Sequence, residues 1–349
     1  MRTVAVVMGG MSSEHEVSLS SGRQAFAALD RRRYRPVEVV IEPDGAWRVD
    51  GLRRGDALEG ARALKELGCE IALLMLHGHR GEDGTIQGFL DMLGIPYTGS
   101  GVGGSALAWD KIAAKRLVAT LGIAVAKDLV LPPATAEQVG PALGFPVFVK
   151  DPCGGSSLEV RLAKDEESLR RAVREIGARR LLVEAAVGGR EVTVPVLDDG
   201  DGVPRALPVV EIRSRGGFFD YENKYTAGVA EEIVPAPLAP PVARRLADAA
   251  LATHRLLGLR AMSRSDFILR DDGTPVFLEV NTIPGMTPNS LLPKAAAAAG
   301  IAFADVLARL LESARAPATM DRVWNASSGR SGGRSTGSST APTAGRSSS

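Results

Sequence analysis

The chain has 349 residues, of which 45% are hydrophobic and 24% are charged, a composition typical of a globular protein with two or three domains. Its 42 Lys and Arg residues nearly balance 41 Asp and Glu residues, and the formal charge of +1 excludes a strong overall field that would attract nucleic acid or an anionic membrane. Two cysteines, Cys69 and Cys153, exclude a disulfide framework and indicate a reducing compartment. The apolar runs at 4–8 and 295–300 are too short for a signal peptide or a membrane span, so we expect a cytoplasmic protein.

The first part of the chain alternates predicted strands and helices. Strands separated by helices favour a parallel α/β sheet, whose ligands bind beyond the carboxyl ends of the strands. Gly9-Gly10 end the first predicted strand and His77-Gly78 follow the strand at 71–76, so we expect both pairs at the ligand-binding edge. The elements are predicted at 3–10 (strand), 18–29 (helix), 37–42 (strand) and 71–76 (strand).

The rest of the chain mixes strands and helices and ends in a different kind of sequence. Residues 263–285 predict a hairpin, with Asp272-Gly273 supplying the turn. From Ser327 onward the chain is mainly Ser and Gly, which favours disorder because little apolar surface can be buried. Other elements are predicted at 105–121 (helix), 145–150 (strand), 166–177 (helix), 181–187 and 190–198 (strands), 241–257 (helix) and 303–313 (helix).

Three motifs make the sequence recognisable: GGMSSEHEVSLSSG at 9–22, HGHRGEDGTIQG at 77–88 and FLEVNTIPGMTPNSLLP at 277–293. In this order they strongly resemble the D-alanine–D-alanine ligases of the ATP-grasp superfamily, and the resemblance runs from about residue 2 to residue 311. It implies an ATP-grasp architecture that is α/β at the start and α+β in the later domains. The implied parts are an N-terminal Rossmann-like parallel-sheet domain (1–99), a central domain with the phosphate loop (100–183), a C-terminal domain with the metal and oxyanion sites (184–315) and a disordered tail (316–349).

A metal site is predicted on the hairpin. Asp266 lies in its first strand, while Glu279 and Asn281 lie two apart in the second strand and therefore on one face. Two carboxylates and an amide oxygen are hard ligands that suit Mg²⁺. The resemblance gives the same three positions and implies ATP as co-substrate with two Mg²⁺ or Mn²⁺ ions. The alternative is a polar hairpin face that only contacts water.

Nucleotide binding is assigned by the resemblance, with Glu184, Val187 and Glu191 at the adenosine end. Glu184 would accept a hydrogen bond from the adenine amino group, the backbone of Val187 would complete the purine contact, and Glu191 would hold the ribose. A pair of strands with Glu side chains in water is the alternative. The phosphate contacts are assigned to Lys111, Lys150, Ser156 and Lys224, where the small residues of CGGSS (153–157) allow close backbone approach.

Substrate contacts are also assigned by the resemblance. Glu14 would bind the ammonium group of the first D-alanine, and Ser156 and Tyr225 would complete that network. His77 matches a histidine near the same substrate, although a structural role in its turn is the alternative. Ser290 and the backbone N–H of Leu291 would bind the carboxylate of the second D-alanine, and Pro288-Asn289-Ser290 predicts a helix entry, a favourable place for an anion.

The implied reaction is ATP-dependent peptide-bond formation through an acyl phosphate, for peptidoglycan precursors. Arg264 and the backbone N–H of Gly285 would stabilise the oxyanion. The family also implies a homodimer, with two D-alanine molecules as ligands and neither nucleic acid nor membrane as partner. Another second substrate, such as D-lactate or D-serine, and an ATP-binding regulator without turnover are the alternatives. Positions that depart from the family pattern are Asp151, Glu159, Ser265 and Ala185-Ala186.

Overall fold

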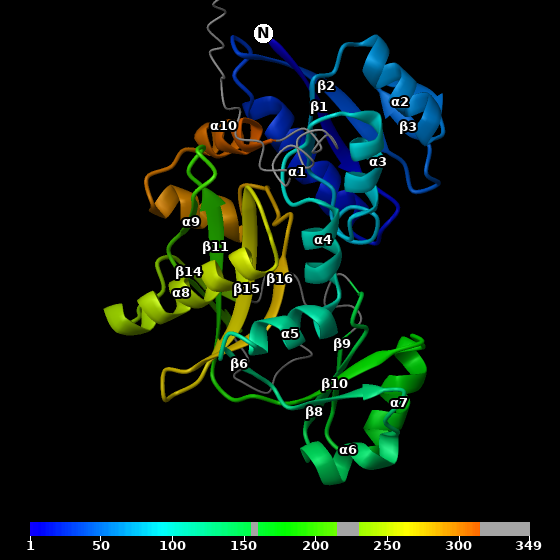
Figure 1. Cartoon of the computed structure of the whole chain (residues 1–349). Coiled ribbons are helices and arrows are strands. Elements are labelled where there is room, and N and C mark those ends of the chain that lie inside the picture. Colours follow the sequence, from blue (N-terminus) through cyan, green and yellow to red (C-terminus); the bar gives the residue numbers. More distant parts are fainter. Residues whose placement is uncertain (155–159, 215–229, 315–349) are drawn as a thin grey trace, which may run out of the picture. The chain divides into compact units, whose positions relative to one another are not determined.

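Three β-sheets, each packed on its own hydrophobic core, organise the chain (Figure 1). The computed structural model describes residues 1–154, 160–214 and 230–314, which all belong to one compact unit. The tail that was predicted to be disordered lies outside these residues, and so does Glu159. The limits of the three predicted domains stay predictions.

The first sheet is built around β1, whose residues Val4–Met8 are completely buried, as expected for an apolar strand between two parallel neighbours. It pairs in parallel with β2 and β5, which confirms the predicted parallel arrangement. Two antiparallel strands, β3 and β4, extend one edge, and the sequence reasoning missed them. In spatial order the strands are β4 (Leu52–Gly55), β3 (Trp47–Val49), β2 (Tyr34–Ile41), β1 (Arg2–Gly9) and β5 (Ile71–Leu74), and the accompanying helices are α1 (His15–Ala28), α2 (Ala57–Glu66) and α3 (Thr85–Leu93).

The second sheet has four antiparallel strands with α6 and α7 packed against it. Its strand β8 ends at Lys150, directly before the loop predicted to bind phosphate. Residues 155–159 of that loop lie outside the described part of the chain. The elements are β7 (Asp128–Leu131), β10 (Leu181–Ala185), β8 (Val147–Lys150), β9 (Val160–Ala163), α6 (Ala136–Leu143) and α7 (Glu166–Ile176).

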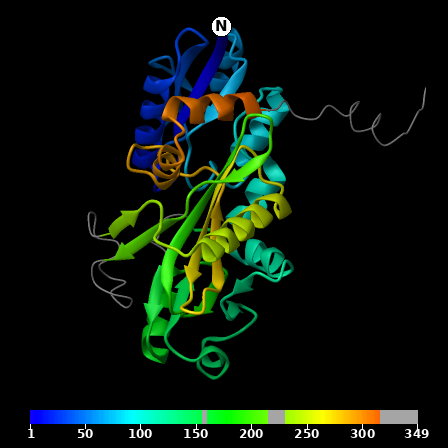
Figure 2. The same cartoon turned by 90° about the vertical axis from the view of Figure 1, so that its left-hand side faces the viewer.

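The third sheet has seven strands, and α8 packs against β11, β12, β15 and β16 (Figure 2). β11 is the longest of its strands and pairs with β12, β13 and β15. Helix α10 packs against both α1 and β11. The elements are β14 (Ala230–Ile233), β13 (Val210–Ser214), β11 (Arg190–Asp198), β12 (Pro204–Ala206), β15 (Met262–Leu269), β16 (Pro275–Asn281), β6 (Ala124–Val125), α8 (Pro240–Leu256), α9 (Leu291–Ala298) and α10 (Phe303–Ser313).

The predicted hairpin is present as β15 and β16. Asp272 accepts a hydrogen bond from the N–H of Thr274 at 2.9 Å, and Gly273 takes φ 77°, a left-handed conformation that favours glycine. The pairing shifts after Asp266, which lies opposite Glu279, while Phe267 lies opposite Phe277. This bulge brings Asp266 and Glu279 side by side across the strands.

One prediction of a helix is wrong. Residues 105–121 were expected to form a single helix, but the structure has α4 (Val102–Trp109) and α5 (Lys111–Ala119). Asp110 separates them with an extended backbone, and its carboxylate accepts hydrogen bonds from Ile112 N (2.9 Å) and Ala113 N (3.1 Å). An aspartate that caps a new helix satisfies N–H groups that would otherwise lack partners. The break places Lys111 in the first turn of α5.

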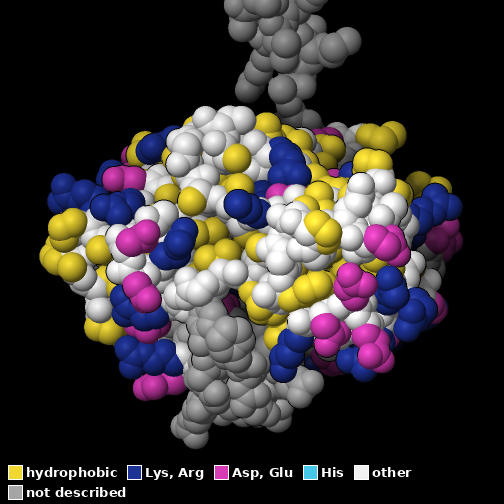
Figure 3. All heavy atoms as spheres, turned by 90° about the horizontal axis from the view of Figure 1, so that it is seen from below, with side chains coloured by type: hydrophobic (Ala, Val, Ile, Leu, Met, Phe, Trp, Pro, Cys, Tyr) yellow, Lys and Arg dark blue, Asp and Glu magenta, His cyan; other side chains and the backbone are white. Residues whose placement is uncertain are grey.

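Two features bear on possible partners. On the face drawn in Figure 3, side chains of Lys and Arg are interspersed with those of Asp and Glu, in keeping with a net charge near zero. Among the described residues no single helix is long and apolar enough to cross a membrane. The helices α9 and α10, which meet at a bend, would together be long and apolar enough, by length and composition alone.

The start of β15 is held by a buried polar cluster. Asp198, at the end of β11, accepts a hydrogen bond from Ala261 N at 2.8 Å. His254 on α8 pairs through Nδ1 with the hydroxyl of Ser263 at 2.8 Å, and its Nε2 lies 3.8 Å from Asp198 Oδ1. Burial, with a smaller contribution from Arg255, lowers the pKa of His254 to about 4. The ring is therefore neutral at physiological pH.

We expect Asp110→Ala to lower the free energy of unfolding by about 1 kcal/mol, because the first N–H groups of α5 lose their acceptor. Urea denaturation followed by circular dichroism measures this. Asp110 also pairs with the exposed Arg180, so Arg180→Ala is the control and should cost less than about 0.5 kcal/mol. An equal loss in both variants would assign the effect to the ion pair instead of the cap.

We also expect the stability to fall as the pH drops from 6.5 towards 4. In this window the unfolded chain protonates His254 at its usual pKa while the folded chain does not, so protons favour unfolding. The contribution of this one group between pH 7 and pH 5 is about 2 kcal/mol. His254→Gln should therefore show a weaker pH dependence than the parent in urea titrations at both pH values. Identical pH dependence in the two proteins would contradict the assignment.

Candidate active site

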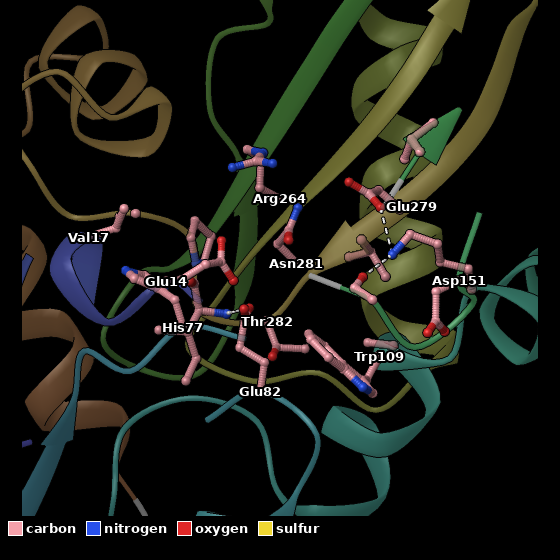
Figure 4. Close-up of a pocket in the computed structure, with 18 residues that line it drawn as sticks. Glu14, Val17, His77, Glu82, Trp109, Asp151, Arg264, Glu279, Asn281 and Thr282 are labelled. Carbon is pink, nitrogen blue, oxygen red and sulfur yellow. Dashed lines mark hydrogen bonds and ion pairs between the residues drawn. The ribbon is translucent and has the colours of Figure 1, made fainter. Parts of the chain in front are cut away.

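A cavity of about 300 Å³ lies where the loops after β1 and β5 face the β15–β16 hairpin (Figure 4). Glu14 and His77 line it from the first sheet, and Lys111 lines it from α5. The hairpin and the loop that follows it supply the remaining predicted residues of the wall, which are Arg264, Glu279, Asn281 and Gly285. Residues predicted from distant motifs therefore share one cavity.

Arg264, which lines this cavity, forms a two-pronged ion pair with Asp266. Arg264 donates from Nε and Nη2 to the two carboxylate oxygens of Asp266, both at 2.9 Å. Thr193 on β11 donates its hydroxyl to Asp266 Oδ1 at 2.5 Å. Burial alone lowers the pKa of Arg264, but attraction to Asp266 outweighs it and raises that pKa above its usual value. The Arg264 guanidinium is therefore charged, and the two hydrogen bonds fix the orientation of both side chains.

Glu279 and Asn281 lie next to this pair. Glu279 Oε2 is 3.2 Å from Lys111 Nζ. Burial alone raises the pKa of Glu279, but Lys111, Lys150 and Arg264 outweigh it and hold that pKa below its usual value. Asn281 Nδ2 is buried and has no hydrogen-bond partner among the described residues, a state that folded proteins generally avoid.

The residues of the predicted metal site fit a hard divalent cation by their chemistry. Asp266 and Glu279 are adjacent across the strands, and a half-turn of the Asn281 amide would exchange its nitrogen for an oxygen ligand. Among the described residues, no three His, Cys, Asp or Glu side chains form a metal-binding group. The predicted site therefore depends on Asn281 as its third ligand.

His77 is held from two sides at the end of the first sheet. Its Nδ1 donates to the carbonyl of Ile283 at 3.0 Å, and its Nε2 lies 3.1 Å from the hydroxyl of Ser21. That hydroxyl also accepts from Met286 N at 3.2 Å. Burial lowers the pKa of His77 despite the opposing charge of Glu14. The neutral ring therefore joins α1 to the loop after β16 while it lines the cavity.

Glu82 is a residue of the cavity wall that the sequence reasoning missed. Its carboxylate accepts from Gly78 N at 2.9 Å and from Ile283 N at 3.1 Å, so it joins the loop after β5 to the loop after β16. Burial raises its pKa, although both backbone hydrogen bonds and the nearby Arg264 oppose this. Its place in the HGHRGEDG motif was the available signal.

Gly285 and Ser290 are neighbours. A Cβ on Gly285 would lie 2.7 Å from Ser290 Oγ, so a larger residue would displace the serine. Ser290 precedes α9 as predicted, but its hydroxyl contacts Thr287 Oγ1 (2.8 Å) and Thr287 N (3.1 Å) and does not cap the helix. Leu291 opens α9, so its N–H has no partner within the helix. Gly285 lines the cavity, whereas Ser290 and Leu291 do not.

The predicted adenosine contacts lie outside the cavity wall. Glu184, Val187 and Glu191 come from β10, the loop after it and β11. Glu184 is buried and forms ion pairs with Lys150 (2.6 Å) and with Lys115 (2.5 Å). Lys150, which was predicted to contact phosphate, thus pairs with a carboxylate in this structure. Lys115 is a second residue that the sequence reasoning missed.

Several predicted residues are not covered by the structure. Ser156, Lys224 and Tyr225 lie outside the described residues. Of the departures from the family pattern, Asp151 lines the cavity and accepts a hydrogen bond from Cys153 N at 2.8 Å. Ser265 is completely buried, is not part of the cavity wall, and its hydroxyl has no hydrogen-bond partner within the described part of the chain.

Comparison with known proteins relates most of the described chain to one family. A family model for the D-ala D-ala ligase N-terminus matches residues 3–100, and one for the D-ala D-ala ligase C-terminus matches residues 117–312. A D-alanine–D-alanine ligase of Desulforudis audaxviator is 42% identical over 322 residues, which cover 90% of this chain and 99% of that protein.

Solved structures match as well. The D-alanine–D-alanine ligase of Bacillus anthracis complexed with ATP superposes with a TM-score of 0.73 at 32% identity, covering 90% of this chain and 97% of the other. The VanG D-Ala:D-Ser ligase of Enterococcus faecalis gives a TM-score of 0.79 at 29% identity, covering 88% and 98%. Three sheets and a cavity that gathers Lys111, Arg264 and Glu279 define an enzyme of the ATP-grasp class. Within that class, the chain belongs to the D-alanine–D-alanine ligase family.

We expect Glu82→Gln to lower the free energy of unfolding by about 1–3 kcal/mol, because an amide has one oxygen and leaves a buried backbone N–H without an acceptor. Thermal and urea denaturation measure the loss. Asp83→Asn is the matched control, since Asp83 accepts from Arg80 N and Thr85 N at 2.8 and 2.9 Å but lies partly exposed, where water can replace a lost bond. A larger loss in Asp83→Asn than in Glu82→Gln would contradict this role.

Proposed function

We propose that this chain joins two molecules of D-alanine to give D-alanyl-D-alanine, with cleavage of ATP to ADP and phosphate, for peptidoglycan precursor synthesis. The observation that carries the proposal is the cavity itself. It holds Glu14 and His77 on one wall and Arg264, Asn281 and Glu279 on the other, so an ammonium group and an activated carboxylate have separate partners. The family to which the chain belongs supports the same reaction.

ATP is needed because a carboxylate does not react with an amine. Transfer of the γ-phosphoryl group to the first D-alanine makes an acyl phosphate, whose phosphate is a good leaving group. Lys111, Lys150 and Lys224 are proposed to neutralise the phosphate oxygens, with Ser156 in the loop beside them. A bound Mg²⁺ would add further neutralisation of those oxygens. Asp266, Glu279 and Asn281 are the residues proposed to hold it.

The two amino-acid substrates are proposed to bind to separate groups of residues. Glu14 attracts the ammonium group of the first D-alanine, beside the neutral ring of His77 and with Ser156 and Tyr225 completing the network. Ser290 and the N–H of Leu291 bind the carboxylate of the second. The neutral amine of the second substrate then attacks the acyl phosphate.

The attack creates a negatively charged oxygen, which needs fixed positive partners. Arg264 is fully charged and oriented by Asp266, and the N–H of Gly285 lies in the same wall. A donor placed in advance contributes about 3 kcal/mol to such a step. Phosphate then leaves, and no residue of the chain forms a covalent intermediate.

The nucleotide base is proposed to bind through Glu184, the backbone of Val187 and Glu191. A homodimer, a cytoplasmic location and the use of two Mg²⁺ or Mn²⁺ ions also belong to the proposal. D-Alanine is proposed as the second substrate because the relatives named above as D-alanine–D-alanine ligases match most of this chain.

We expect phosphate release from ATP that requires both D-alanine and Mg²⁺, with D-alanyl-D-alanine identified by mass spectrometry. L-Alanine, D-serine and D-lactate are tested separately as second substrates and should give less product. Chelation of the metal, and Asp266→Asn, should each lower kcat by two orders of magnitude or more, since charge on the transferred phosphoryl group loses its partner. ATP cleavage at the same rate without D-alanine would refute the proposal.

A further inference from the structure

Lys115 is among the most deeply buried charged side chains in the described part of the chain, with 1% of its side chain exposed. It lies on α5, one turn after Lys111, and reaches two carboxylates on neighbouring strands. Its Nζ is 2.5 Å from Glu184 Oε1 on β10 and 3.0 Å from Asp128 Oδ1 on β7. A buried ammonium group requires such partners, because transfer of an unpaired charge from water is costly.

Glu184 is held by two lysines, one at each oxygen. Lys115 contacts Oε1, and Lys150 contacts Oε2 at 2.6 Å. Burial alone raises the pKa of Glu184, but attraction to Lys150 and then Lys115 outweighs it and holds that pKa below its usual value. The carboxylate is thus ionised, with both of its oxygens engaged.

The two lysines differ in how firmly they are held in place. Lys150 ends β8 with 14% of its side chain exposed, directly before the loop assigned to the phosphates, so it can move from Glu184 to a phosphate oxygen. Lys115 is enclosed and also anchored by Asp128, so it cannot leave. When Lys150 moves, Oε2 of Glu184 becomes available as an acceptor, and Oε1 keeps its cation.

We propose that Lys115 is the positioning residue for base recognition: it holds Glu184 ionised and aimed at the exocyclic amino group of adenine after Lys150 has moved to the phosphates. This inference rests on the proposed function, in which Glu184 meets the base. An ionised carboxylate can only accept hydrogen bonds. It therefore favours a base with an amino group at this position and disfavours one with a carbonyl oxygen, as in inosine triphosphate.

The test is the ratio of ATP affinity to inosine triphosphate affinity, measured by isothermal titration calorimetry without D-alanine. In Lys115→Met the ratio should fall roughly tenfold, because Glu184 loses its permanent cation and either takes up a proton or keeps Lys150. Arg116→Met is the matched control. Arg116 is the next residue and pairs with the same Asp128 at 2.5 Å, but it is half exposed and forms no ion pair with Glu184. In Arg116→Met the ratio of ATP affinity to inosine triphosphate affinity should stay within about twofold of the parental ratio.

A double-mutant cycle separates positioning from a general structural effect. Glu184→Gln should lower the ratio by itself, since an amide can donate to a carbonyl oxygen. Adding Lys115→Met to Glu184→Gln should change the ratio no further, because Lys115 acts only through the carboxylate. This pair removes both charges together, so the double variant keeps the charge balance that the single variant lacks.

Each outcome of these affinity measurements either supports or contradicts the role of Lys115. A folded Lys115→Met protein with the parental ratio would overturn the proposal, and so would an additional drop in the Glu184→Gln background. If Lys115→Met does not fold, the comparison of Glu184→Gln with its double variant stands alone, and any further change there counts against the proposal. Because the measurement needs neither D-alanine nor turnover, a failure of the ligase assignment would leave it interpretable.

Discussion

The site depends on one constraint: each carboxylate that is removed from water needs its own positively charged partner or hydrogen-bond donor. Glu82 is satisfied by two backbone N–H groups, Asp266 by a guanidinium, and Glu279 by Lys111. Burial works against the charge of Glu82 and Glu279 by raising the pKa of each; at Glu279 the neighbouring cations outweigh burial, whereas at Glu82 they do not. The parts of the fold that carry these groups are therefore tied together by electrostatics as well as by packing.

The strands and turns that follow from local pattern could be predicted from the sequence. The apolar run of β1 and the Asp272-Gly273 turn are encoded within a few residues. The break between α4 and α5 was missed because Asp110 stands in an otherwise regular helical sequence, and only its side-chain bonds to Ile112 and Ala113 reveal the new start. The antiparallel edge formed by β3 and β4 was missed because strands of three and four residues leave little periodicity.

The same limit applies to the site. Residues inside distinctive motifs, such as His77 and Arg264, were found, and the structure brings them to one cavity. Lys115 was not found because its partner lies 69 residues away. The contact of Thr193 with Asp266 spans 73 residues, and that of Glu82 with Ile283 spans 201. Contacts between residues so far apart in the sequence leave no local signature, although Glu82 itself lies in the HGHRGEDG motif.

Strand β11 carries residues with three separate roles at fixed spacings. Glu191 near its start belongs to the proposed ribose contact, Thr193 orients Asp266, and Asp198 at its end holds the backbone of Ala261. A residue inserted within such a strand would reverse the facing of every side chain beyond it. Length variation among homologues is therefore expected in the turn after Asp198, where Asp199 N bonds to Val203 O, and not inside the strand. A peptide inserted at this turn should therefore leave the side chains of β11 in place.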